Sequence, residues 1–139
     1  MLEAAARRLP DVLIDPYDSI CEAMAKMDKA GTGGLVLAWP DRQMVGFLTD
    51  GDIRRAILRQ SPLDDSCRGI ANLKPIVASA SVSAADALHL LTTHDISHLP
   101  LVDADNRVVG LLLRKDLAQT GSPEQTARFR SATQRVTGR

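Results

Sequence analysis

Gly46-Phe-Leu-Thr-Asp-Gly-Asp52 and, later in the chain, Gly110-Leu-Leu-Leu-Arg-Lys-Asp116 are two versions of one heptapeptide. A shift of 64 positions, the repeat shift, aligns them without a gap, and over positions 19 to 53 the same shift gives nine identities in 35 positions. Several of the other pairs place one apolar residue opposite another, as with Met27 and Leu91. Self-similarity at a fixed period indicates a repeated structural unit. The chain therefore contains two copies of one unit.

Both copies have the same pattern of apolar residues. Short apolar runs that predict strands alternate with segments that open on Ser or Asp and whose apolar residues recur at helical spacing. A single β-α-β-β-α unit of this size buries only a marginal apolar surface for an independent domain, and two copies packed together bury more. The predicted fold is therefore α+β, with tandem β-α-β-β-α repeats packed sheet to sheet about a pseudo-twofold axis. The first copy predicts a strand at 12–14, a helix at 18–30, strands at 35–38 and 44–48, and a helix at 51–59; the second predicts the same elements at 76–78, 83–94, 99–102, 108–113 and 114–119.

The composition between and beyond the copies sets the predicted boundaries. The first repeat domain covers 10–60 and the second 74–119, and a linker at 61–73 with a short helical segment separates them. A tail at 120–139 is rich in Thr, Ser and Arg and is predicted to be frayed or helical rather than functional. If the chain is a fragment of a longer protein, this tail and residues 1–9 are the natural junctions.

The overall composition excludes several classes of protein. Hydrophobic residues make up 45% and charged residues 24% of the 139 residues, which is typical of a compact globular protein. Lys+Arg and Asp+Glu both number 17 and aromatic residues make up 3%, so neither net charge nor a stacking surface favours nucleic acid. No apolar run has the length of a signal peptide or a membrane span, which predicts a cytoplasmic protein without membrane contact. Cys21 and Cys67 have no neighbours at metal-ligand spacing and are expected to be plain thiols.

The first heptapeptide has the chemistry of an anion site. A strand that ends in Thr49 immediately before a helix offers backbone N–H groups, a hydroxyl and the positive end of the helix dipole to a phosphate. Asp52, in the first helical turn, is placed to accept hydrogen bonds from vicinal ribose hydroxyls, and Arg54 and Arg55 can supply charge-assisted contacts to phosphate. Alternatively, Asp52 is only a helix-start carboxylate and Thr49 only a β-branched strand residue.

The doubled motif is a Gly followed by two apolar residues, Ser or Thr, two free positions and Asp, and it resembles the signature of CBS domains (cystathionine β-synthase domains). The pair resembles a Bateman module over about residues 10–119. Residues 49–55 and 96–103 are most similar to CBS pairs associated with sugar-phosphate isomerases or sugar nucleotidyltransferases. The resemblance implies a regulatory module that binds an adenosine nucleotide (AMP, ADP or ATP) or a related nucleotide between the copies. It also implies a homodimer and an attached or partner enzyme that the module regulates.

The same resemblance implies which residues hold the nucleotide. Thr49 and Asp52 would lie at the ribose and phosphate end of the cleft. Gly34 has a plainer alternative as the tight-turn start of a strand, and His98 as a histidine that only makes a structural hydrogen bond. In the family's cleft, the residues beside the base would be Ile14, Gly34 and Leu35, and those near the phosphate would be Ser97 and His98.

The second cleft is expected to be weak or empty because Leu113 stands where the first copy has Thr49. The leucine removes the hydroxyl, so that Arg114, Lys115 and Asp116 remain as possible ligands there. Arg114 and Lys115 can equally be solvated residues of a helix start.

Three functions compete. The leading hypothesis is the ligand-sensing CBS pair, and the second is a dimerisation scaffold without a ligand, which would use apolar helix residues such as Met24 and Met27. An enzyme is the weakest hypothesis, because the sequence has no Ser/His/Asp or Cys/His constellation, no metal cluster and no GxxxxGK loop. The chain is therefore predicted to be a binding module with no required cofactor, and it can be a fragment of a larger enzyme.

Overall fold

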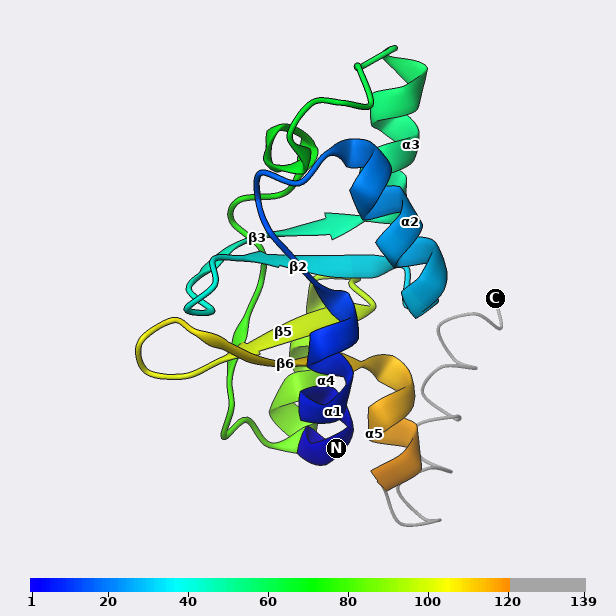
Figure 1. Cartoon of the computed structure of the whole chain (residues 1–139). Helices are drawn as coiled ribbons and strands as arrows, with labels where there is room; N and C mark the ends of the chain where they lie inside the picture. Colours follow the sequence, from blue (N-terminus) through cyan, green and yellow to red (C-terminus); the bar gives the residue numbers. More distant parts are fainter. Residues whose placement is uncertain (121–139) are drawn as a thin grey trace, which may run out of the picture.

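The computed structural model describes residues 1–120 and contains two three-stranded sheets, ordered β1-β2-β3 and β4-β5-β6. In Figure 1, α2 and α3 flank the first sheet, and α1, α4 and α5 surround the second. The predicted α+β fold with two sheet-containing copies is confirmed. The elements are α1 Leu2–Val12, β1 Leu13–Ile14, α2 Ile20–Ala30, β2 Gly34–Ala38, β3 Met44–Thr49, α3 Asp50–Leu58, the 3-10 helix η1 Cys67–Ile70, β4 Ala78–Ser79, α4 Ala84–Thr93, β5 His98–Val102, β6 Val108–Leu113 and α5 Arg114–Thr120.

The period of the sequence is reproduced in the strands. The repeat shift superimposes the bounds of β2 on those of β5, and the bounds of β3 on those of β6. In each sheet the short first strand is parallel to the second, which pairs antiparallel with the third. Even the irregularity repeats, because the register shifts between Leu37 and Ala38 in one hairpin and between Leu101 and Val102 in the other. The two copies therefore have the same sheet topology and register.

Side-chain caps set where the helices begin. The Ser19 hydroxyl accepts a hydrogen bond from the Glu22 N–H at 3.0 Å, and the Ser83 hydroxyl accepts one from the Asp86 N–H at 3.1 Å. Each cap satisfies a backbone donor that the first turn of a helix leaves unpaired. α2 starts two residues and α4 one residue after the predicted position, and in both the capping residue directly before the helix is not helical.

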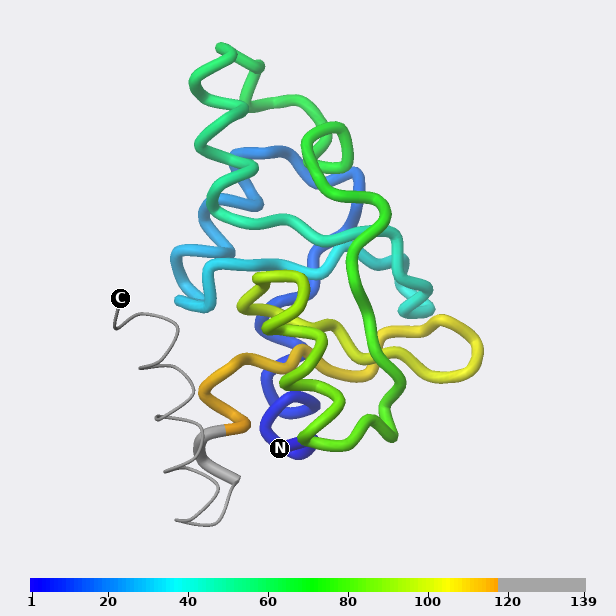
Figure 2. The backbone as a smooth tube through the Cα atoms, turned by 180° about the vertical axis from the view of Figure 1, so that it is seen from behind, coloured from blue at the N-terminus to red at the C-terminus, as the bar shows by residue number. Residues whose placement is uncertain are grey.

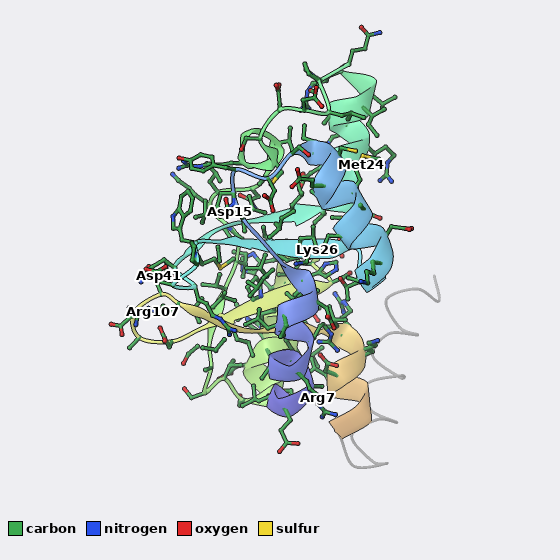
Figure 3. All side chains as sticks on the ribbon, in the orientation of Figure 1. Arg7, Asp15, Met24, Lys26, Asp41 and Arg107 are labelled. Atoms are coloured by element: carbon green, nitrogen blue, oxygen red, sulfur yellow. The ribbon has the colours of Figure 1, made fainter. Side chains whose placement is uncertain are left out.

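The two hairpin turns meet at the pseudo-twofold axis. Arg42 and Asn106, which occupy the same position in the two copies, both have positive φ angles, of 74° and 61°. The Met44 N–H donates to the Asn106 carbonyl and the Val108 N–H to the Arg42 carbonyl, at 3.1 and 2.9 Å. Asp41 and Arg107 label these neighbouring turns in Figure 3. Backbone hydrogen bonds thus join the copies at the end of the hairpins.

Each sheet is covered by the segment that precedes the other copy. α1 buries Ala5, Leu9 and Val12 and lies on β6, where a Cβ on Gly110 would come within 3.1 Å of the Ala5 backbone. Val12, predicted to begin a strand, closes this helix instead, and the helix continues through Pro10. A segment that comes before the predicted start of copy one therefore packs on copy two.

The linker packs against the first sheet, as α1 packs against the second. Asn72 and Phe47 exchange two backbone hydrogen bonds of 2.9 Å, which extends the first sheet past β3. A Cβ on Gly46 would lie 2.6 Å from the Asn72 carbonyl oxygen, so the linker approaches as closely as only glycine permits. Figure 2 shows this linker running from the upper sheet to the lower one. Each sheet is therefore covered or extended by the segment that precedes the other copy.

Candidate ligand-binding pocket

A pocket of about 370 Å³ lies between the two copies. One side comes from the end of β3 and the start of α3, and the opposite side from the loop before β5 and from β5 itself. The linker closes a third side. The lining residues are Phe47, Thr49, Asp50, Asp52, Asn72, Pro75, Ile76, Asp95, Ile96, Ser97, His98 and Pro100.

Thr49 and Asp52 form a capping box at the first turn of α3. The Asp52 N–H donates to the Thr49 hydroxyl oxygen at 3.2 Å, and Asp52 Oδ2 accepts from the Thr49 N–H and the Thr49 hydroxyl at 2.9 and 3.0 Å. A box of this kind satisfies two donors that a helix start otherwise leaves unpaired. The carboxylate is thereby held in place at the pocket with 19% of its side chain exposed.

Two arginines lie beside the same helix start. Arg55 Nη2 donates to Asp52 Oδ1 at 2.7 Å, with 62% of the arginine side chain exposed. Nitrogens of both Arg54 and Arg55 come within 3.6 Å of the position that a Cβ on Gly51 would occupy. Because exposed ion pairs of this kind are weak, Arg55 can exchange Asp52 for an anionic ligand at little cost. The predicted cations therefore lie at the helix start, although neither belongs to the pocket lining.

His98 connects the two copies at the pocket. Its Nε2 lies 2.6 Å from the Thr32 carbonyl, and because a carbonyl only accepts, the proton is on Nε2. The ring also packs against Phe47, with centroids 5.3 Å apart. A Cβ on Gly34 would lie 2.4 Å from Phe47 and 3.1 Å from His98, so this glycine makes room for the two rings. His98 makes the structural hydrogen bond of the alternative interpretation and also lines the pocket.

Four of the predicted ligand residues line the pocket, and the two arginines of α3 lie beside it. Thr49, Asp52, Ser97 and His98 share the pocket. Gly34 lies behind the two rings, and Ile14 and Leu35 are buried in the core, at 5% and 0% exposure. They are buried because the strands of the first sheet are covered on both faces. None of the predicted base-side residues Ile14, Gly34 and Leu35 lines this pocket.

The pocket lining outside the predicted set comprises Phe47, Asp50 and Pro100, which lie in β3, α3 and β5, and two further groups from the segment 72–76 and the loop before β5. Asn72, Pro75 and Ile76 reach the first copy's helix start because the segment that begins at Asn72 pairs with that sheet. Asp95 and Ile96 directly precede Ser97 and are counterparts, by the repeat shift, of the glycine-rich turn before β2. The repeat thus contained a signal for Asp95 and Ile96. Asn72, Pro75 and Ile76 could be found only from the structure, which shows where their segment lies.

In the second copy, the residues that correspond to the first copy's helix start mostly contact other parts of the protein. Asp116 is 1% exposed and receives two hydrogen bonds from Arg8 of α1, at 2.8 and 2.9 Å, and one from the Leu113 N–H at 2.8 Å. Burial acts to raise the pKa of the Asp116 carboxyl, but the hydrogen bonds from Arg8 and Leu113 and the Arg8 charge outweigh it and leave this pKa lowered. Arg114 donates to the Leu91 carbonyl at 3.1 Å, whereas Lys115 is exposed. Leu113 itself packs in the core that the first copy contributes.

Within residues 1–120 no three His, Cys, Asp or Glu side chains are grouped to hold a metal ion. In the same part of the chain no helix is both long and apolar enough to cross a membrane. The cytoplasmic location stays a prediction.

The fold and the site define a tandem-repeat protein with a pocket between its two copies. The chain belongs to the CBS domain family, whose model matches residues 6–59 and 67–121. These two matches contain the two heptapeptides, so the resemblance seen in the sequence is confirmed.

The relatives show the settings in which such pairs occur. The chain is 34% identical over 110 residues to a protein of Helicobacter pylori (78% of this chain, 33% of the relative) and 33% identical over 118 residues to arabinose 5-phosphate isomerase KdsD of Pseudomonas aeruginosa (81% and 34%). The chain thus spans about a third of the length of these curated relatives. Among solved structures, a CBS domain protein of Pyrobaculum aerophilum complexed with AMP superposes with a TM-score of 0.74 at 25% identity, covering 90% of this chain and 98% of that one. The predicted likeness to CBS pairs of sugar-phosphate isomerases is therefore confirmed.

Proposed function

We propose that this CBS pair is a ligand-sensing module that binds one adenosine nucleotide in the pocket between its copies and modulates an attached or partner enzyme. The observation that carries the proposal is the pocket itself, in which the Thr49–Asp52 helix start faces Ser97 and His98 of the other copy. The AMP complex of the Pyrobaculum aerophilum relative supports an adenosine nucleotide as the ligand. The isomerase relative supports a sugar-phosphate isomerase as the regulated enzyme.

The pocket offers each part of such a nucleotide a matching group. Apolar walls for a purine come from Phe47, Pro75, Ile76, Ile96 and Pro100. Asp52 Oδ1, whose present partner is the exposed Arg55, can accept hydrogen bonds from the ribose. The start of α3 with Arg54 and Arg55 suits the phosphate.

Binding is proposed to act through the relative position of the two copies. A nucleotide in the pocket would touch Asp52 on one copy and Ser97 and His98 on the other, and His98 already links to Thr32 of the first copy. A ligand shifts a conformational equilibrium only by its difference in affinity for the two arrangements. Contacts to both copies can supply that difference.

We also propose a homodimer through the helices that cover the first sheet. Met27, predicted to be available for such an interface, is buried in the core at 7% exposure, so the prediction is wrong for this residue. Met24 is half-buried and lies on α2 next to α3 (Figure 3). Ile57 and Leu58 on α3 are exposed apolar residues that a second copy would cover.

Calorimetric titration of the full chain with AMP, ADP, ATP, GTP and S-adenosylmethionine tests the ligand. We expect submillimolar binding of an adenosine nucleotide, and at least a tenfold loss in Asp52→Asn, since a hydrogen bond to a charged group contributes roughly 1.5–3 kcal/mol. Asp64→Asn, an exposed linker carboxylate outside the pocket, is the matched control. If no nucleotide binds below millimolar concentration, the sensor fails and the ligand-free dimerisation scaffold remains.

A further inference from the structure

The two repeats use the same carboxylate in different ways. Asp52 and Asp116 occupy the same position in the two copies, and each accepts a hydrogen bond from the backbone N–H at the end of the preceding strand, that of Thr49 at 2.9 Å and that of Leu113 at 2.8 Å. Beyond that bond they differ. Asp52 pairs with an arginine of its own helix that is 62% exposed, whereas Asp116 pairs with Arg8 of α1, which is 14% exposed. One carboxylate is left at a pocket and the other is enclosed.

The segments that cover the two sheets place different side chains at these carboxylates. The carbonyl of Phe47 accepts a hydrogen bond from the backbone N–H of Asn72. Its counterpart in the second copy, the carbonyl of Leu111, accepts one from the guanidinium of Arg8. The repeat shift also relates Arg8 to Asn72. Corresponding positions of α1 and the linker thus reach the same carbonyl of the repeat, one through its side chain and one through its backbone.

We infer that Arg8 is a built-in occupant of the second nucleotide site, and that the side chain at positions 8 and 72 decides whether a repeat can bind a ligand. The fork of Arg8 contacts both oxygens of Asp116, neutralises its charge and covers it to 1% exposure, so a ribose cannot reach this carboxylate while Arg8 is in place. Asn72 is too short to do this and only borders the open pocket. The inference rests on the proposed function for the identity of the ligand, but not for the closure.

An arginine at position 72 would close the first pocket in the same way. In the second copy one guanidinium nitrogen, Nη1, bonds both the Leu111 carbonyl and Asp116. Because strand and helix start repeat at the same spacing, the Phe47 carbonyl and Asp52 present the same pair of acceptors. The N–H of Asn72 already lies 2.9 Å from that carbonyl, so a guanidinium at this position is within reach of both.

The test compares Asn72→Arg with Asn72→Ala by AMP calorimetry and thermal denaturation of the full chain. We expect the native chain to bind one AMP, and Asn72→Arg to bind at least tenfold more weakly than Asn72→Ala. The new ion pair should also raise the Tm of Asn72→Arg by about 3 °C over Asn72→Ala, and this gain should vanish when Asp52→Asn is added. Gly69→Arg places the same charge on η1, where an added Cβ meets nothing within 4 Å, and controls for long-range electrostatics.

Two results would overturn the inference: two AMP molecules bound per native chain, or binding by Asn72→Arg that stays within twofold of Asn72→Ala. If the native chain binds no AMP, the proposed function fails, and the Tm measurement then decides the closure alone. A gain in Tm that depends on Asp52 supports it, and the absence of such a gain refutes it.

Discussion

Replacing Arg8 with alanine tests whether α1 is fastened to the second copy by the buried ion pair. The change removes two hydrogen bonds, of 2.8 and 2.9 Å, from Asp116, which is 1% exposed. It also removes the hydrogen bond from Arg8 to the Leu111 carbonyl. Removing one partner of a buried pair costs about 3–5 kcal/mol. Since Arg8 retains 14% exposure, we expect about 3 kcal/mol and a fall in Tm of about 10 °C.

Urea denaturation followed by circular dichroism measures this cost. Arg7→Ala is the matched control, because Arg7 is the exposed neighbour of Arg8 on α1 (Figure 3) and should change stability by no more than about 0.5 kcal/mol. An Arg8→Ala variant no less stable than Arg7→Ala would show that the buried ion pair does not fasten α1.

Acidification gives the same prediction a second readout. Because the folded pKa of Asp116 is lowered from 3.8, its contribution to stability is present above pH 3.8 and is lost as pH falls through the lowered value. Without Arg8, burial is opposed less and the pKa of Asp116 is higher in Arg8→Ala than in the native chain. The stability difference between the two chains should therefore be full at pH 7 and shrink as pH falls from the pKa of Asp116 in the variant to its lowered pKa in the native chain. A difference that does not change over this range would contradict the ion pair.

Two further predictions concern close packing and the thiols. Gly46→Ala should cost about 1–3 kcal/mol in urea denaturation, because the new Cβ would lie 2.6 Å from the Asn72 carbonyl, whereas Gly69→Ala should not destabilise the chain; equal effects would contradict the packing described here. At pH 8 a thiol reagent should label Cys21 rapidly and Cys67 only after unfolding, because burial is the main cause that raises the pKa of Cys67 to about 11; rapid labelling of both in the native chain would be the contrary result.

Local patterns were sufficient to predict most of the elements. The strand predicted at 108–113 matches β6 residue for residue, and the helix predicted at 83–94 differs from α4 by its capping residue at each end. Both succeed because hydrophobic periodicity and cap residues act over a few positions. The repeat then extended the same interpretation from one copy to the other.

Contacts between distant segments were not predictable from such patterns. Arg8 and Asp116 are separated by 108 positions, and nothing in the local sequence of α1 indicates that its partner is the second copy. The same is true of Asn72 and Ile76, which reach the pocket because the segment that begins at Asn72 pairs with the first sheet. Ile14 and Leu35 were placed at the ligand from the family's cleft, yet the coverage of both sheet faces buries them. The sequence thus predicted the elements of each copy better than the contacts between the copies.

Titration of AMP into the isotopically labelled full chain, followed by amide chemical shifts, tests whether the nucleotide binds between the two copies. We expect saturable shifts at submillimolar AMP in two groups, residues 49–52 of the first copy and 95–98 of the second, with residues 113–116 little affected. Those two groups belong to opposite sides of one pocket. The absence of saturable shifts, or shifts confined to 113–116, would contradict binding between the copies.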